Sequence, residues 1–232
     1  MPVPRSRSEG PLKQQFDVHD AFDRLRVAVG QLPKAAMFDL RDQGFKSPFL
    51  LLVGSLISAR TRDETTVRVC LRLFEAANTP EMMISLGERR LARLLHGATF
   101  PEPKARDLIA ICERLTKDFS GEVPANFETL QTFRGVGPKI AALTLSLGYG
   151  IPMIAVDVHV HRVTNRWGYV RTRTPEQTML ALESKLPKRY WIEINERLVP
   201  FGKAVCTGTA PPRCSTCLLQ SICERVGVKV SR

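Results

Sequence analysis

The stretch Phe133-Arg134-Gly135-Val136-Gly137-Pro138-Lys139 interrupts a helical pattern with two glycines two residues apart. Before it, residues 126–132 begin with an asparagine, a preferred N-cap residue, and are typical of a short helix. Pro138 suits the first turn of a second helix, where its missing N–H leaves no hydrogen bond unmade. After it, one face at amphipathic-helix spacing comprises Ile140, Leu143, Thr144 and Leu147. The sequence therefore predicts a helix, a tight Gly-x-Gly hairpin and a second helix.

Such a hairpin can bind an anion. Glycine adopts positive φ and lets another group approach the backbone, and the first N–H groups of a helix attract negative charge. We therefore expect Gly135, Val136 and Gly137 to contact a phosphate. The chain has 34 Lys and Arg against 23 Asp and Glu, a net charge of +11, which favours a polyanionic partner. An ordinary interhelical turn in a basic protein fits the same two observations.

The rest of the chain predicts an all-α fold. Helix start signals of the type Thr-x-x-Glu or Thr-Pro-Glu occur at residues 61–64, 79–81 and 174–176. Helical apolar spacing recurs at 16–29, 48–59, 67–74, 91–95, 108–115 and 160–167, and a last helix with Tyr190 and Trp191 runs towards Cys206. An extended apolar link, 151–156, leads to Asp157 at an N-cap position.

The N-terminal residues and the length of the apolar runs predict the cellular compartment of the protein. Residues 1–14 are rich in Pro, Ser and Arg, which predicts a flexible tail, and they contain no apolar signal sequence. The longest apolar run, 49–59, is too short to cross a bilayer. We therefore expect a cytoplasmic protein without a membrane partner, in a compartment where disulfides are uncommon.

Six cysteines divide into two kinds. Cys70 and Cys112 sit on apolar helical faces, which predicts buried core thiols. The other four are spaced C-x7-C-x2-C-x5-C, at Cys206, Cys214, Cys217 and Cys223. Four thiols so close together indicate a metal centre, and tetrahedral thiolate ligands suit either zinc or an iron–sulfur cluster. Metal binding would then fix the shape of the C-terminal loop.

Lys139 and Asp157 can do chemistry on a sugar held at the hairpin. A lysine amine can attack the C1′ carbon of a nucleotide and form a Schiff base, once its pKa is lowered enough for the neutral form to exist. A carboxylate at Asp157 can orient that amine or stabilise a cationic sugar. A plain N-cap and a phosphate-binding lysine are the alternatives at these two positions.

Residues 130–139, the phrase Ile154-Ala-Val-Asp-Val-His-Val-His-Arg-Val163 and the four terminal cysteines together resemble the endonuclease III family of helix-hairpin-helix DNA glycosylases. The likeness covers roughly residues 18 to 225. It implies a bifunctional enzyme that acts on oxidised pyrimidines in duplex DNA. Lys139 would displace the damaged base, Asp157 would be the catalytic aspartate, and the Schiff base would cut the strand by β-elimination.

The resemblance also implies the architecture and the cofactor. It predicts a six-helix barrel lobe over 41–151 and a cluster lobe built from 15–40 and 152–226. The four cysteines would hold a [4Fe–4S] cluster, although the first spacing, x7, is one residue longer than the usual x6. Duplex DNA would lie between the lobes with the target nucleotide flipped out, which places the protein at the nucleoid. Nothing in the sequence requires more than a monomer.

Three positions differ from the common pattern of the family. Arg134 replaces the usual proline before Gly-Val-Gly and can add a phosphate contact or simply be exposed. Arg60 stands where the family often has a glutamine that fills the gap left by the flipped base. Phe100 stands where a leucine commonly wedges into the base stack. Two further functions remain open: a lyase acting mainly on abasic sites, and a non-catalytic DNA-binding protein.

Overall fold

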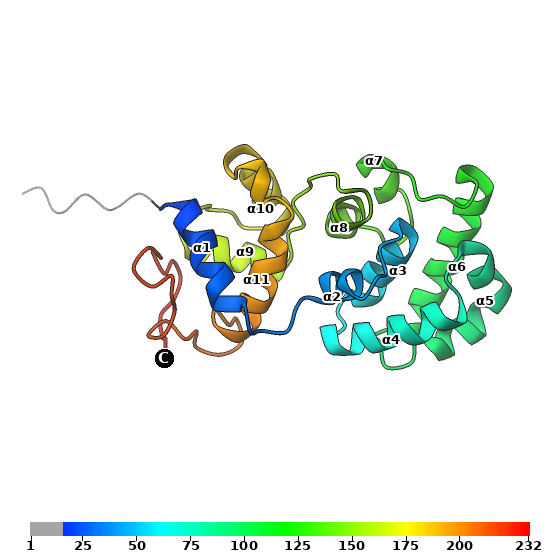
Figure 1. The fold of residues 1–232 in the computed structure, drawn as a ribbon, viewed down its shortest axis with the longest axis horizontal. Helices are drawn as coiled ribbons and strands as arrows, with labels where there is room; N and C mark the ends of the chain where they lie inside the picture. Colours follow the sequence, from blue (N-terminus) through cyan, green and yellow to red (C-terminus); the bar gives the residue numbers. More distant parts are fainter. Residues whose placement is uncertain (1–15) are drawn as a thin grey trace, which may run out of the picture.

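The computed structural model describes residues 16–232, and the tail expected over 1–14 lies outside them. The described residues form two helical lobes side by side along the long axis of the molecule (Figure 1). Among the described residues, β-type backbone pairing is limited to one isolated bridge between His96 and Ala98. The all-α prediction is therefore confirmed.

The first lobe holds seven consecutive helices: α2 (Ala36–Asp42), α3 (Pro48–Ser58), α4 (Asp63–Ala76), α5 (Pro80–Leu94), α6 (Pro101–Phe119), α7 (Phe127–Gln131) and α8 (Pro138–Tyr149). The second lobe holds α1 (Val18–Val29), α9 (Val158–Arg166), α10 (Pro175–Lys185), the 3-10 turn η1 (Lys188–Tyr190), α11 (Glu193–Ala204) and the C-terminal loop. Each lobe has its own cluster of buried apolar side chains. Residues 35–40, which the sequence analysis assigned to the cluster lobe, pack in the core of the first lobe.

Most of the predicted helix starts are confirmed by their caps. The hydroxyls of Thr79 and Thr174 accept hydrogen bonds from the third amide beyond them, and so does the side chain of Asn126. The capping box at 61–64 is wrong: the N-cap of α4 is Arg62, and its side chain makes no capping bond. The hydroxyl of Thr61 instead accepts hydrogen bonds from Thr99 N and Lys104 Nζ.

Two predicted helices differ from their sequence patterns. The helix after the hairpin, α8, is confirmed, but it is buried on nearly all sides rather than amphipathic, because it packs against α2, α3 and α7. The last helix begins only at Glu193. Tyr190 belongs to η1, where its ring stacks on Phe22 of α1 at a centroid distance of 4.0 Å. Cys70 and Cys112 are both fully buried, as predicted.

Two polar side chains of α11 make contacts where the lobes meet. The amide of buried Asn195 on α11 donates to the carbonyl of Ala155 at 3.0 Å, in the link between α8 and α9. The ammonium of Lys203, also on α11, lies 2.8 Å from a carboxylate oxygen of Asp63, and Glu64 lies 3.4 Å away. These contacts hold the link and the first turn of α4 against the second lobe.

We expect Gly148→Val to lower the free energy of unfolding by about 1–3 kcal/mol, because α8 and α3 cross too closely for a side chain there. A Cβ at Gly148 would lie 2.9 Å from the Cα of Pro48. Urea denaturation followed by circular dichroism measures the change. Ser184→Val, at an exposed position of α10, is the control and should change stability by less than about 0.5 kcal/mol. Equal effects of the two substitutions would contradict this view of the crossing.

Candidate active site and thiol cluster

The hairpin presents open backbone at the N-terminus of α8. Gly135 has φ 76°, in the left-handed region that favours glycine, and a Cβ there would lie 3.2 Å from a carboxylate oxygen of Asp107. Gly137 is extended, and a Cβ added to it would meet nothing within 4 Å. None of the described residues accepts a hydrogen bond from the amides of these two glycines. The hairpin can therefore approach an anion with its backbone.

The two other hairpin residues contribute differently. Val136 is 5% exposed, and its amide donates to the carbonyl of Phe133 at 3.1 Å. Val136 therefore anchors the turn in the core, and its amide is already bonded. Arg134 is exposed, with its Nε 2.7 Å from Asp107 of α6. A phosphate contact from Arg134 remains a prediction, and its guanidinium has an acidic partner beside it.

Lys139 and Asp157 come together although they belong to different lobes. Lys139 lies in the first turn of α8, and its Nζ is 3.4 Å from Oδ2 of Asp157, the N-cap of α9. The other oxygen, Oδ1, accepts the amides of His159 and Val160, both at 2.9 Å. Asp157 is therefore a true N-cap, and the capping bonds leave one carboxylate oxygen facing the amine.

Lys139 stands at the wall shared by two cavities. The larger, about 870 Å³, is the cleft between the lobes, and it is lined by Asp157, His159, Arg60 and Lys203 among others. The smaller, about 210 Å³, is lined by residues of both lobes, including Ser55, Ser58, Ile140, Leu143, Glu176 and Met179. Ligand sites for drug-sized molecules are typically about 300–1,000 Å³. The smaller cavity therefore has room only for a group smaller than a drug-sized ligand.

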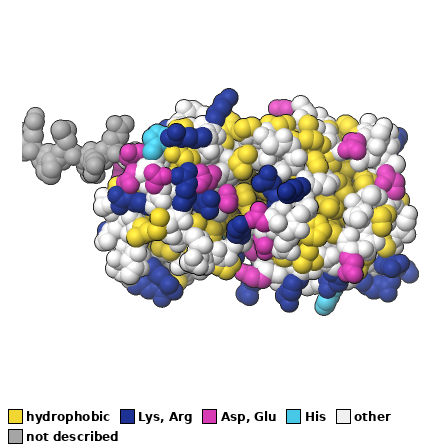
Figure 2. Space-filling view, in the orientation of Figure 1, with side chains coloured by type: hydrophobic (Ala, Val, Ile, Leu, Met, Phe, Trp, Pro, Cys, Tyr) yellow, Lys and Arg dark blue, Asp and Glu magenta, His cyan; other side chains and the backbone are white. Residues whose placement is uncertain are grey.

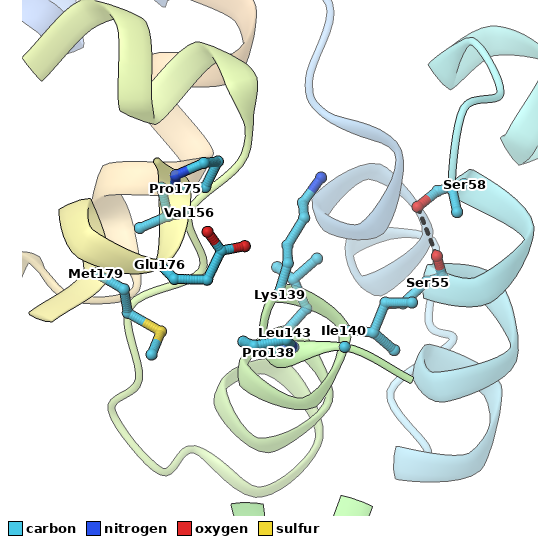
Figure 3. Close-up of a pocket in the computed structure, with 12 residues that line it drawn as sticks. Ser55, Ser58, Pro138, Lys139, Ile140, Leu143, Val156, Pro175, Glu176 and Met179 are labelled. Carbon is cyan, nitrogen blue, oxygen red and sulfur yellow. Dashed lines mark hydrogen bonds between the residues drawn. The ribbon is translucent and has the colours of Figure 1, made fainter. Parts of the chain in front are cut away.

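Glu176 and Met179 of α10 form the wall of the smaller cavity opposite α8. Figure 3 shows the carboxylate of Glu176 directed towards the side chain of Lys139. Hydrogen bonds from its own backbone amide and from the Thr174 hydroxyl hold the pKa of Glu176 below its usual range, so it is ionised at neutral pH. Sequence reasoning found only a helix start at 174–176, because nothing in the pattern indicates which cavity that helix faces.

The two histidines of α9 have separate surroundings. His159 lines the cleft, and its Nδ1 lies 3.0 Å from a guanidinium nitrogen of Arg162. Burial lowers the pKa of His159, which favours the neutral ring. His161 instead contacts the hydroxyl of Thr178 on α10, at 2.6 Å, and so joins two helices of the second lobe.

Arg60 and Phe100 lie on adjacent loops of the first lobe. The hydroxyl of Thr99 donates to the carbonyl of Arg60 at 2.8 Å. Both residues have left-handed backbones, with φ 60° and 58°, and the Phe100 side chain is 53% exposed. An exposed aromatic ring of this kind is available to contact a partner.

The four terminal cysteines meet around one small cavity of about 30 Å³ in the C-terminal loop, the red segment of Figure 1. All four are free thiols. Within residues 16–232, no three His, Cys, Asp or Glu side chains converge tightly enough to hold a single ion. Four cysteine thiols around one cavity are the ligand type that iron–sulfur clusters use.

Hydrogen bonds to sulfur and to the loop backbone support this arrangement. The guanidinium of Arg166 donates to the sulfur of Cys206 at 3.3 Å, and the amide of Arg225 donates to the sulfur of Cys223 at 3.4 Å. Arg162 donates to the carbonyl of Cys206. Burial raises the pKa of Cys223 to about 11 and also raises the pKa of Cys217, so these two thiols are protonated at neutral pH when no metal is bound.

Charged side chains are unevenly distributed on the surface. Figure 2 shows basic and acidic side chains together at the junction between the lobes, and several basic side chains along the lower edge of the first lobe. Lys203 pairs with acidic residues of α4. In the part of the chain that the structure describes, no helix is both long and apolar enough to cross a membrane.

Sequence comparison finds a family and close relatives. The profile of the HhH-GPD superfamily base excision DNA repair proteins matches residues 53–188. Endonuclease III of Thermotoga maritima is 38% identical over 177 residues, which are 76% of this chain and 83% of that protein. Endonuclease III of Treponema pallidum is 33% identical over 206 residues, which are 89% of this chain and 94% of that protein.

Structure comparison gives the same family. A trapped Endonuclease III–DNA covalent intermediate has a TM-score of 0.79 at 28% identity, covering 90% of this chain and 94% of that one. A thermostable thymine-DNA glycosylase has a TM-score of 0.70 at 18% identity, covering 88% of this chain and 97% of that one. The second similarity concerns the fold alone.

The N-cap role of Asp157 predicts a difference between two substitutions. Asp157→Ala should lower the free energy of unfolding by about 1 kcal/mol, because two helix amides lose their acceptor, whereas Asp157→Asn should cost only a few tenths, roughly, because asparagine caps about as well. Urea denaturation measures both, and Asp17→Ala, which removes the same kind of cap from α1, is the matched control. Equal stability of the alanine and asparagine variants would show that the cap contributes nothing.

Proposed function

This chain belongs to the HhH-GPD superfamily of base excision DNA repair proteins, and we propose that it removes oxidised pyrimidines from duplex DNA with Lys139 as the nucleophile. Its similarity to Endonuclease III proteins identifies it as a DNA glycosylase and AP lyase. The observation that supports the roles of the residues is the 3.4 Å approach of Lys139 Nζ to Asp157 Oδ2 beside the smaller cavity.

The geometry supports a covalent mechanism. The damaged nucleotide turns out of the helix, and its base enters the cavity of about 210 Å³ beside Lys139. The neutral amine attacks C1′, the N-glycosidic bond breaks with its electron pair on the base, and the proton lost by the amine returns to the base through solvent. The carboxylate of Asp157 stabilises the positive charge that develops on the sugar.

The second half of the reaction cuts the strand. The sugar ring opens to a Schiff base between Lys139 and C1′, which acidifies the C2′ proton. Loss of that proton and departure of the 3′ phosphate give β-elimination, and water then releases the amine. The amino group is therefore an electron sink as well as a nucleophile. On an abasic site the same steps begin at the open sugar, without base departure.

DNA binding follows from the hairpin and the cleft. The amides of Gly135 and Gly137 would hold a phosphate at the N-terminus of α8, which places the sugar near Lys139. The side chains of Arg60 and Phe100 would enter the DNA duplex from adjacent loops of the protein. Arg134 would contact the DNA phosphate backbone nearby. In our proposal the protein acts as a monomer at the nucleoid in the cytoplasm.

We further propose that Cys206, Cys214, Cys217 and Cys223 hold a [4Fe–4S] cluster. The support is that all four thiols line one cavity, because cysteine thiolates are the usual ligands of iron–sulfur clusters. Bound there, the cluster would supply four metal–thiolate bonds that fix the loop. Arg162 and Arg166 of α9 hold the same loop to the second lobe from the protein side.

A lyase acting mainly on abasic sites is the second candidate. Arg60 and Phe100 favour it, since they replace the glutamine and leucine common in the family. A non-catalytic DNA-binding protein would not need the ion pair of Lys139 and Asp157.

Borohydride trapping tests the nucleophile. Wild type should form a covalent adduct with a thymine glycol duplex and with an abasic duplex, and Lys139→Ala with neither, because borohydride reduces only a Schiff base. Asp157→Asn should trap the thymine glycol duplex at least about tenfold more slowly, with its fold intact. Adducts in Lys139→Ala would refute the nucleophile, and trapping of the abasic duplex alone by wild type would favour the lyase.

Metal analysis tests the cluster. The purified protein should be brown and contain about four iron and four sulfide per chain, and Cys214→Ser should lose colour and stability together. Ser215→Ala, the neighbouring position, is the control and should keep both. A colourless wild type with stoichiometric zinc would contradict the cluster.

A further inference from the structure

Lys104, in the first turns of α6, is a buried charge that the proposed reaction does not use. It is 8% exposed, and its ammonium donates to the carbonyls of Ile57 and Ala59 at 2.6 and 2.8 Å, and to the hydroxyl of Thr61 at 3.0 Å. An ammonium has three N–H donors, so all of them are matched. All three acceptors belong to the segment where α3 ends.

The same network continues into the second loop. The hydroxyl of Thr61 also accepts the amide of Thr99 at 3.1 Å, and the hydroxyl of Thr99 donates to the carbonyl of Arg60 at 2.8 Å. Residues 57–61 and 99–104 are therefore joined by five hydrogen bonds, with Lys104 at their centre.

This network surrounds the two left-handed residues. Arg60, at φ 60°, follows Ala59, and Phe100, at φ 58°, follows Thr99. Residues other than glycine rarely adopt this left-handed backbone conformation, so contacts with the surrounding residues must stabilise it. Each of the two residues lies next to a residue that is bonded in the network. Ala59 also lines the small cavity, so the same bonds fix part of its wall.

The end of α3 favours a positive charge. The carbonyls of Ile57 and Ala59 are among the last of that helix, where the helix dipole is negative. Burial lowers the pKa of Lys104 to about 8, so the ammonium is still the main form at neutral pH. The charge therefore stays available to bind its three acceptors.

We propose that Lys104 is a positioning residue that joins the Arg60 and Phe100 loops into one rigid unit, so that both side chains enter the duplex together while the damaged nucleotide turns out. The inference rests on the proposed function and adds to it a residue for base extrusion. Lys139 and Asp157 lie on other elements, α8 and the N-cap of α9. Loss of Lys104 should therefore slow extrusion and leave the chemistry at an abasic sugar nearly unchanged.

The main variant is Lys104→Met, which keeps the length of the side chain and removes the ammonium. Thr99→Val is milder, since it removes only the hydroxyl bond to Arg60 and keeps the backbone amide bond to Thr61. Lys117→Met is the matched control: it is the same change at another lysine of α6, but that lysine is exposed.

Single-turnover rates on a thymine glycol duplex and on an abasic duplex separate the two effects. We expect Lys104→Met to slow base release about tenfold or more and Thr99→Val about threefold, with cleavage of the abasic duplex within about threefold of wild type for both. The fluorescence of a 2-aminopurine base placed beside the lesion should rise more slowly in both variants, because it reports unstacking of the bases. The delay should be larger for Lys104→Met than for Thr99→Val. The control should match wild type in every measurement.

Equal loss on both duplexes would overturn the inference, because Lys104 would then be only a general brace of the lobe. Unchanged base release in both loop variants would overturn it too. If Lys104→Met does not unfold cooperatively, the test rests on Thr99→Val alone. The quantity compared is then the ratio of its base-release rate to its rate of cleavage of the abasic duplex, relative to the same ratio for wild type. Failure of wild type on both duplexes would refute the proposed function itself, whereas an active wild type with unaffected variants refutes only the role of Lys104.

Discussion

The carboxylate of Asp157 is the constraint on which the candidate site depends. One oxygen is bound by two amides that begin α9, and this fixes the position of the other oxygen, 3.4 Å from the amine of Lys139. The two residues belong to different lobes, so their distance is set by how the lobes meet. The buried side-chain amide of Asn195 helps to fix how the lobes meet, because it donates a hydrogen bond to the carbonyl of Ala155, two residues before Asp157.

The first lobe supplies rigidity where the site needs it. Helix α8 is buried on nearly all sides, and its close crossing with α3 leaves no room for a side chain at Gly148. The N-terminus of α8 is therefore held firmly while the hairpin before it keeps free amides in a loop that a phosphate can approach. Close-packed interiors resist displacement, so the packing of α8 fixes the backbone from which Lys139 extends.

The second lobe holds the thiol loop against α9 in a comparable way. A Cβ at Gly202 would lie 2.7 Å from a ring nitrogen of His159, and one at Gly208 would lie 2.8 Å from the guanidinium of Arg162. Gly202 belongs to α11 and Gly208 to the loop that follows it, so α11 and this loop can pack this closely on α9 only because both positions are glycine. Since Asp157 is the N-cap of α9, the C-terminal loop and this carboxylate are attached to the same short helix.

The sequence by itself determined the helical class, most of the caps, the hairpin, the core thiols and the grouping of four cysteines, because each depends on residues close together in the chain. It also paired Lys139 with Asp157, through a resemblance to a family. Only the tertiary structure decided that Thr61 bonds to Lys104 and Thr99 instead of capping α4, that α8 is buried on nearly all sides, and that Glu176 points towards the side chain of Lys139. These facts depend on which distant segments meet, and periodicity and capping patterns describe one segment at a time.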